Sequence, residues 1–145
     1  MNKNEPDKTI SPIAEYAKIL RGLELKNILL TRCVCNLIRE RLTPDMKIAI
    51  RSASSYKKTE KDIIEIAQKY FLEASSQTKK EIFLNIECDY ILEYASAQEI
   101  NDAFFERFKK TSLPLNAWPF FREFVNNITS RMYIPPFTLP LIKNI

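Results

Sequence analysis

Four carboxylates at alternating positions form the clearest group of titratable residues in this sequence of 145 residues: Glu81, Glu87, Asp89 and Glu93. In a β-strand they would share one face, because side chains two residues apart point the same way. Carboxylates at this spacing could bind a cation or share a proton. They fit equally well the solvated face of a sheet, or a strand edge that pairs with lysines. Solvation is the favoured interpretation, because few other titratable groups converge in the pattern.

Several kinds of chemistry are excluded by residue types that the sequence lacks or barely uses. The absence of histidine removes the commonest general base and makes a Ser-His pair impossible. Cys33, Cys35 and Cys88 have no CxxC spacing, so we interpret them as apolar strand residues in a reducing compartment. A single glycine, Gly22, rules out the usual Gly-rich phosphate loops. We therefore predict a protein that is not an enzyme and that needs no metal or cofactor.

The elements that position these residues are predicted to begin with β-strands. Residues 79–95 alternate apolar and polar side chains, which is a strong strand signal, and weaker patterns cover residues 23–38, 46–56 and 62–74. Apolar residues on both faces of 23–38 indicate a strand covered on both sides. The links between the last three strands are short and polar, and such links join antiparallel neighbours. The sequence therefore predicts a four-stranded antiparallel meander.

A short helix is predicted before the sheet. Ser11 is a suitable N-cap, Pro12 fits the first helical position, and Gly22 fits a helix stop. Residues 1–10 are expected to be a disordered lead.

Two longer helices are predicted after the sheet. Residues 96–99, Ser-Ala-Gln-Glu, fit a capping box that opens a helix to about residue 110. Leu113-Pro114 is expected to break this helix, and Asn116 to cap the next one. Strands followed by helices predict an α+β fold, with the two helices packed on the sheet of a single domain spanning residues 1–145.

The C-terminal third concentrates the aromatic residues. A helical wheel places one group on one side of the last helix: Trp118, Phe120, Phe121, Phe124, Val125, Ile128 and Met132. It places Glu123 and Thr129 on the other side. Prolines then force an extended, apolar C-terminal arm over residues 134–142. The apolar area of the two helices and the arm is larger than one face of a small sheet can bury. It therefore indicates oligomer interfaces or an exposed apolar groove. Pairing at a sheet edge beside apolar pockets is a general way to hold an extended peptide.

Composition sets further limits on the class of protein. No apolar run approaches the roughly 20 residues of a membrane span, and residues 1–8 do not introduce a signal-peptide core. We therefore expect a cytoplasmic protein without direct membrane insertion. The net charge of +4 is small, and the lysines and arginines are scattered along the sequence. Nucleic-acid binding is therefore not expected.

Three motifs in the C-terminal third resemble the signature helix and loop of the SecB-like protein-export chaperones: Trp118-Pro119-Phe120-Phe121-Arg122-Glu123, Ser130-Arg131 and Pro135-Pro136-Phe137-Thr138-Leu139. The resemblance covers residues 23–142. It implies an ATP-independent holdase for unfolded or precursor polypeptides, assembled as a homotetramer from a dimer of dimers. It also implies apolar grooves between the sheet and the helix linker, and these groove candidates: Trp118, Phe120, Phe121, Phe137 and Leu139. Arg122 and Glu123 are expected to orient the helix through ion pairs or backbone bonds.

The chain departs from the general export members of that family. Those members are acidic and dock the export motor ATPase on an acidic sheet face, whereas this chain is net basic. Only Glu87 is a possible motor-docking residue. The segment over residues 17–32 is more similar to the divergent SecB-like chaperones of toxin–antitoxin systems. The alternatives are a chaperone dedicated to one client, such as an antitoxin, and an oligomeric structural or nucleic-acid-associated protein.

Overall fold

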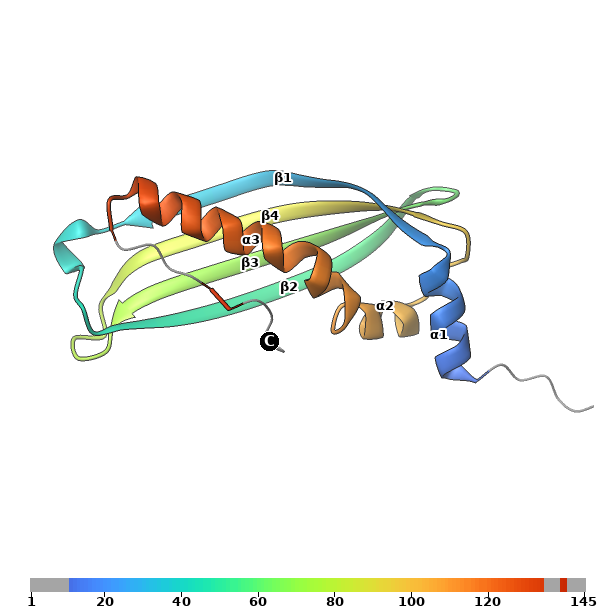
Figure 1. Cartoon of the computed structure of the whole chain (residues 1–145), viewed down its shortest axis with the longest axis horizontal. Helices are drawn as coiled ribbons and strands as arrows, with labels where there is room; N and C mark the ends of the chain where they lie inside the picture. Colours follow the sequence, from blue (N-terminus) through green and yellow to red (C-terminus); the bar gives the residue numbers. More distant parts are fainter. Residues whose placement is uncertain (1–10, 135–138, 141–145) are drawn as a thin grey trace, which may run out of the picture.

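The computed structural model describes residues 11–134 and 139–140. The described elements, in chain order, are α1 (Pro12–Arg21), β1 (Leu23–Leu37), the 3-10 turn η1 (Arg39–Arg41), β2 (Met46–Glu60), β3 (Ile63–Ser76), β4 (Ile82–Ser96), α2 (Asp102–Phe108) and α3 (Ser112–Arg131). Four long strands form one sheet, α3 lies across one of its faces, and α1 and α2 lie at one end (Figure 1). Within the described residues, no helix is long and apolar enough to cross a membrane.

The sheet is antiparallel throughout, as predicted, but its strand order is β1-β4-β3-β2. The predicted hairpins β2–β3 and β3–β4 are confirmed. The meander is wrong, because β1 pairs with β4 and not with β2. Residues 38–45 carry the chain from one edge of the sheet to the other. That crossing spans about 14 Å, or three strand spacings, which a link of this length reaches easily.

The alternation of the central strands matches their burial. From Ile64 in β3 and from Leu84 in β4, even-numbered residues face the helices and are buried, whereas the odd-numbered ones are partly or fully exposed on the opposite face. β1 contradicts the expectation of a strand covered on both sides: it is an edge strand on which Leu29 and Leu30 are 46% and 44% exposed. Its apolar residues therefore lie at the border of the core.

The first helix begins and ends where the sequence predicts. The Ser11 Oγ accepts a hydrogen bond from the Ala14 N–H at 3.2 Å. The helix ends at Arg21, and the Gly22 carbonyl accepts a hydrogen bond from the Ala97 N–H at 3.0 Å. A Cβ at Gly22 would lie 3.1 Å from the Cβ of Ala97, so glycine allows this close approach to the linker that follows β4.

The predicted capping box at residues 96–99 is wrong. Ser96 is the last residue of β4 and pairs with Leu23 across the sheet, so tertiary pairing holds it in an extended conformation. The helix begins six residues later with Asn101 as N-cap, whose Oδ1 accepts from the Phe104 N–H at 2.8 Å. Residues 97–101 thus form an extended linker between β4 and α2.

The last helix starts earlier than predicted. α3 begins at Ser112 and contains both Pro114 and Pro119, so the predicted break at Leu113-Pro114 does not occur. Pro114 lies in the first turn, where a backbone N–H has no helical partner to lose. Leu113 is fully buried, and its packing against the core outweighs the local breaker signal. Asn116 is not a cap; its Nδ2 donates to the Tyr94 hydroxyl at 2.8 Å.

Candidate functional site

Two of the predicted groove residues lie in the core beneath α3. Trp118 is 2% exposed and Phe121 is fully buried. Both contact Tyr70 of β3: the Phe121 ring stacks on it with centroids 4.8 Å apart, and the Trp118 ring meets it edge-on at 5.4 Å. Burial raises the pKa of Tyr70 above its ordinary value. These rings anchor α3 to the sheet.

Phe120 lies on a different side of the helix. Its side chain is 50% exposed, although the helical wheel groups it with Trp118 and Phe121. Asn116, Phe120, Phe124 and Ile128 follow one another at intervals of four residues and therefore form one row along α3. Thr129, predicted on the polar side, is fully buried, and its Oγ1 donates to the Val125 carbonyl at 2.7 Å. The buried arc of α3 is therefore rotated from the one that the wheel predicts.

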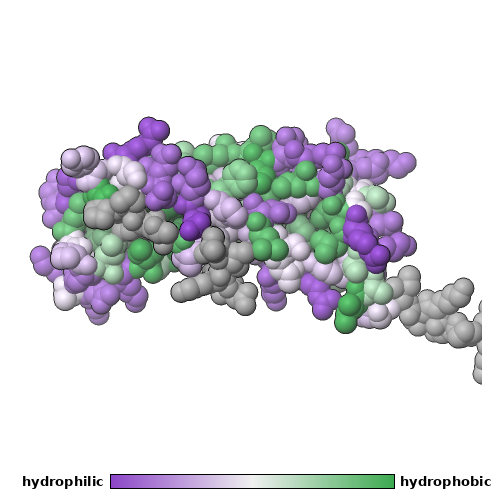
Figure 2. Space-filling model, viewed as in Figure 1, coloured by the Kyte–Doolittle hydropathy of each residue, from purple (hydrophilic) through white to green (hydrophobic). Residues whose placement is uncertain are grey.

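The row that contains Phe120 faces β1. Asn116 reaches Tyr94 on β4, whereas Trp118 reaches Tyr70 on β3, and β4 is the strand next to β1. On β1, Leu30 and Cys33 pair with buried residues of β4 and are themselves exposed. We call this set of residues the β1-side surface: Leu30, Cys33, Phe120, Phe124 and Ile128. Figure 2 shows apolar residues gathered in the region where α3 and β1 lie in Figure 1.

The opposite side of α3 carries the C-terminal arm. The Trp118 Nε1–H donates to the Pro140 carbonyl at 2.7 Å, and the Arg122 Nε–H donates to the Leu139 carbonyl at 2.6 Å. Leu139 is 4% exposed and Pro140 is exposed. The two described arm residues lie beside α3 as the short red segment between grey traces (Figure 1). Phe137, the remaining groove candidate, lies outside the described residues.

The predicted helix-orienting residues have different surroundings. Arg122 is half-buried and bonds the arm. Glu123 is exposed, and its Oε1 accepts from the Asn127 Nδ2 at 3.4 Å. Within the described part of the chain, neither residue forms an ion pair.

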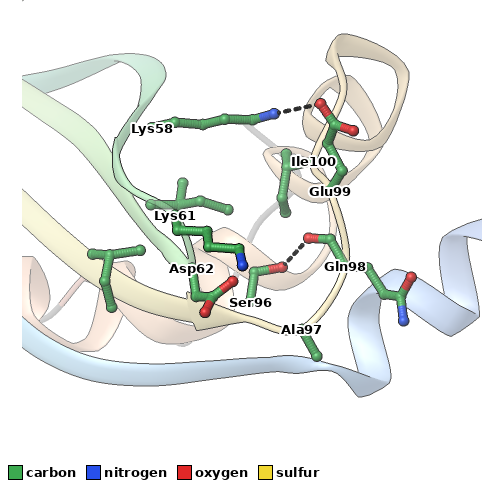
Figure 3. Close-up of a pocket in the computed structure, with 10 residues that line it drawn as sticks. Lys58, Lys61, Asp62, Ser96, Ala97, Gln98, Glu99 and Ile100 are labelled. Carbon is green, nitrogen blue, oxygen red and sulfur yellow. Dashed lines mark hydrogen bonds and ion pairs between the residues drawn. The ribbon is translucent and has the colours of Figure 1, made fainter.

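A hollow of about 280 Å³ lies between the end of the sheet and the linker at residues 97–101. Lys58 of β2 and Glu99 of the linker form an ion pair at 2.9 Å, which lowers the pKa of Glu99 (Figure 3). The Ser96 Oγ donates to the Gln98 carbonyl at 2.6 Å and shapes the linker. No sequence motif marks this hollow, because its walls come from β2, the β2–β3 turn, β3, the end of β4 and the linker. Its remaining lining residues are Lys61, Asp62, Ile63, Ile64, Ala97 and Ile100.

α2 closes the same end of the sheet against β2. The Tyr56 hydroxyl donates to the Asp102 Oδ1 at 2.6 Å, and this bond together with burial raises the pKa of Tyr56 to about 12. The Tyr56 and Phe105 rings lie 4.7 Å apart. We call the hollow, together with the helix-facing side of β2, the β2-side groove. Ile48 and Ile50 also line this side of β2, and Ile48 is 36% exposed.

The acidic residues of β4 lie on the sheet face opposite the helices. Arg32 of β1 pairs with Glu87 at 3.2 Å and with Asp89 at 3.7 Å. On the same face, basic residues of β2 pair with acids of β3: Lys57 with Glu65 at 3.4 Å, and Arg51 with Glu73 at 3.9 Å. This face therefore combines paired charges of both signs. Among the described residues, no group of three or more His, Cys, Asp or Glu could hold a metal ion.

The three cysteines lie in strands, with free thiols. Cys33 lies directly opposite Cys88, which is buried in the core. Burial raises the pKa of the Cys88 thiol to about 12, so this group stays protonated at neutral pH.

Comparison with known proteins was informative only at the level of the fold. No protein-family model matches the sequence, and no curated protein matches it. A solved structure of the Mycobacterium tuberculosis Rv1957 SecB-like chaperone, in complex with a ChAD peptide from the Rv1956 HigA1 antitoxin, superposes with a TM-score of 0.75. It is 14% identical and covers 89% of this chain and 97% of that chain. A protein of unknown function from Streptococcus agalactiae superposes with a TM-score of 0.51 at 10% identity, covering 81% of this chain and 96% of that chain.

The chain therefore has the SecB-like fold. The likeness inferred from the Trp118–Leu139 region is confirmed for the fold by the Mycobacterium tuberculosis structure.

Proposed function

We propose that this protein is a cytoplasmic, ATP-independent chaperone that holds extended segments of unfolded polypeptides. One observation carries the proposal: apolar side chains stay exposed on both sides of α3, Leu30 and Phe120 on the β1 side and Ile48 on the β2 side. Exposed apolar surface of this kind marks contact sites for other polypeptides. Holding needs binding alone, so no cofactor is required.

The client segments are proposed to bind in the β2-side groove. β2 is an edge strand, and it therefore presents a row of backbone groups on its outer side that an extended peptide could pair with. The hollow beside Ile64 and Ile100 lies at one end and offers room for side chains. Ile48, which is 36% exposed, offers an apolar contact elsewhere along the helix-facing side of β2. This arrangement would bind the backbone of client segments with many different sequences and would favour segments that carry apolar side chains.

The β1-side surface is proposed to be buried against further copies of the chain. Leu30 and Phe120 are each about half exposed in one protomer. A homotetramer built as a dimer of dimers would cover them, because obligate interfaces are rich in apolar side chains. The two sides of α3 would then have separate functions: assembly on the β1 side and client binding on the β2 side.

The proposal is tested by aggregation suppression, with the molar mass recorded in the same sample. Light scattering of an unfolded secretory precursor, diluted from denaturant, should fall when the protein is added at one tetramer per precursor. ATP should make no difference. A tetramer that gives no protection would limit the function to a dedicated client, and a monomer that gives none would refute the chaperone proposal.

A chaperone dedicated to one client, such as an antitoxin, is the second candidate. Docking of an export motor would require an acidic sheet face. Arg32 pairs with both Glu87 and Asp89, so the negative charge of that face is largely neutralised. The structurally similar Mycobacterium tuberculosis chaperone was solved with a peptide from an antitoxin. Surface plasmon resonance with a purified export motor ATPase decides between an export role and a role dedicated to one client. Binding that is lost in Glu87→Lys would support an export role, and absence of binding would favour the dedicated client.

A further inference from the structure

The end of the sheet opposite α1 and α2 gathers basic residues that are far apart in the sequence. η1, the start of β2, the β3–β4 turn and the last turn of α3 all lie at this end (Figure 1). Each of these segments contributes at least one exposed cation, and together they form what we call the basic end: Arg39, Arg41, Lys47, Lys79, Lys80 and Arg131. Charges that are scattered along the sequence are therefore concentrated in the folded chain.

Little negative charge opposes these cations. Residues 38–47, 76–82 and 131–134 contain only three carboxylates, Glu40, Asp45 and Glu81. The Asp45 Oδ2 is engaged within the turn, where it accepts from the Thr78 N–H at 3.0 Å and from the Thr78 hydroxyl at 2.8 Å. Across the described part of the chain, none of the six cations forms an ion pair. The basic end thus has an excess of positive charge.

Two arginines of the basic end are held in place by backbone carbonyls. The Arg39 Nη2 donates to the Met132 carbonyl, which ties η1 to the end of α3. The Arg41 Nη1 donates to the Ile82 carbonyl at 3.3 Å, which ties η1 to β4. A guanidinium carries five N–H donors, so each group keeps donors for a carboxylate. Because these side chains are already fixed, less conformational entropy is lost when a ligand binds.

Apolar surface lies beside these cations. Ile38 and Ile82 are 40% and 38% exposed. The Ile38 N–H donates to the Phe83 carbonyl at 2.8 Å, so Ile38 lies next to the first residues of β4. A ligand at this end would therefore meet apolar and basic groups side by side.

We propose that the basic end is a docking surface for an acidic polypeptide segment, one whose carboxylates are separated by apolar residues. Arginine and lysine supply the opposite charge, and the forked guanidinium groups match the two oxygens of a carboxylate. Ile38 and Ile82 contact the apolar residues of the segment. The inference rests on the proposed function only in its choice of a polypeptide as ligand, and it adds a charge preference to that function. None of the six cations belongs to the β1-side surface or to the β2-side groove.

A nucleic acid fits this surface less well. Its backbone carries one negative charge per nucleotide, so it would meet Glu40 and Glu81 as well as the cations. A polypeptide can place a neutral or apolar residue against each of these carboxylates. The mixture of both signs therefore favours a peptide whose charges are spaced.

Fluorescence anisotropy of a labelled peptide tests the inference on the full chain. The probe is a fluorescein-labelled peptide of repeated Glu-Leu-Asp-Ala units, and the control probe carries Gln and Asn in place of the acids. We expect saturable binding of the acidic probe that weakens as NaCl is raised, and no binding of the neutral probe. Arg39→Gln together with Arg41→Gln should weaken binding at least about tenfold, because two charge-assisted contacts are lost.

Two further double variants complete the design. Lys79→Gln with Lys80→Gln lies away from η1 and should weaken binding by a smaller factor; it decides the matter if the arginine variant unfolds in a far-UV check. Lys18→Gln with Arg21→Gln on α1 is the matched control, because it removes the same charge from exposed residues at the opposite end of the sheet. Its affinity should stay within about twofold of the wild type.

Three outcomes would overturn the inference: an acidic probe that does not bind, a control variant that loses as much affinity as the arginine variant, and an oligouridylate RNA that displaces the probe and binds more tightly. The aggregation assay tests the holdase function separately. Probe binding without aggregation suppression would refute the chaperone proposal and leave the docking surface, whereas suppression without probe binding would refute the docking surface alone.

Discussion

The two edge strands of this sheet differ in composition in a way that fits the separate roles proposed for them. β1 carries leucines on both faces, with Leu29 and Leu30 both about half exposed, and two bulges interrupt its pairing. The middle of β2 carries small residues, Ser52-Ala53-Ser54-Ser55, and lysines follow at its end. Lysines on an edge strand oppose edge-to-edge aggregation. β2 is thus suited to reversible contact and β1 to permanent burial.

The comparison extends to the two sides of α3. Phe120 faces the β1 side with half of its surface exposed, whereas Trp118 on the β2 side is buried and bonded to the arm. A helix on a sheet needs only one buried arc, so its flanks are free to differ. Here one flank leaves Phe120 half exposed, and on the other Trp118 and Arg122 bond the carbonyls of Pro140 and Leu139.

The largest effect on stability is expected for a substitution in the core beneath α3, which the β1 side and the β2 side share. Phe121→Ala should lower the free energy of unfolding by about 3–5 kcal/mol, because a fully buried ring stacked on Tyr70 is removed. Urea unfolding at one fixed protein concentration measures it. The neighbouring Phe120→Ala is the control and should cost about 0.5 kcal/mol in the dissociated protomer, where half of its surface is exposed, with any further loss appearing as weaker assembly. Equal losses in the two variants would show that the flanks do not differ.

Assembly should depend on the β1 side alone. Leu30→Lys places a charge in the proposed interface, so the dissociation constant between protomers should rise at least about 100-fold. Sedimentation equilibrium gives the molar mass. Ser52→Lys on β2 is the matched control, because Ser52 is exposed on the helix-facing side of the other edge strand. It should weaken client binding and leave the mass unchanged; the reverse pattern would exchange the roles of the two strands.

Acid should loosen β2 at its first residues. Hydroxyls of Thr43 and Thr78, with the Thr78 backbone N–H, lower the pKa of Asp45 from 3.8 to about 2. A lowered pKa in the folded state means that the carboxylate stabilises the fold above pH 3.8 and loses this effect as the pH falls to about 2. Asp45→Asn should therefore melt below the wild type at pH 7 and match it near pH 2. A constant difference in Tm across this range would contradict the assignment.

The smallest effect is expected for a substitution in the β3–β4 turn, which belongs to neither of the two proposed surfaces. Lys80 has a positive φ of 53°, a conformation that favours glycine. Lys80→Gly should stabilise the fold by about 0.5 kcal/mol or leave it unchanged, because relief of strain is offset by a more flexible unfolded chain. Assembly and client binding should both stay as in the wild type. A change in either one would mean that the turn is coupled to one side.

Much of the local structure was predictable from the sequence. The strand segments, the first helix with its Ser11 cap, and the two hairpins follow from alternation and turn signals between neighbouring residues. The starts of α2 and α3 were not predictable. Ser96 fits a helix cap, yet it pairs with Leu23, and Leu113-Pro114 fits a break, yet Leu113 is fully buried.

The sequence by itself determined the strand periodicity, the identity of the buried face of β3 and β4, and the aromatic and proline signals that predicted the SecB-like fold. These properties depend on residues close together in the chain, whose spacing is set by backbone geometry. Only the tertiary structure decided that β1 lies beside β4, that Phe120 is exposed while Phe121 is buried, and that Trp118 bonds Pro140. Each of these depends on contacts between residues distant in sequence, and the chain makes them only once its elements pack.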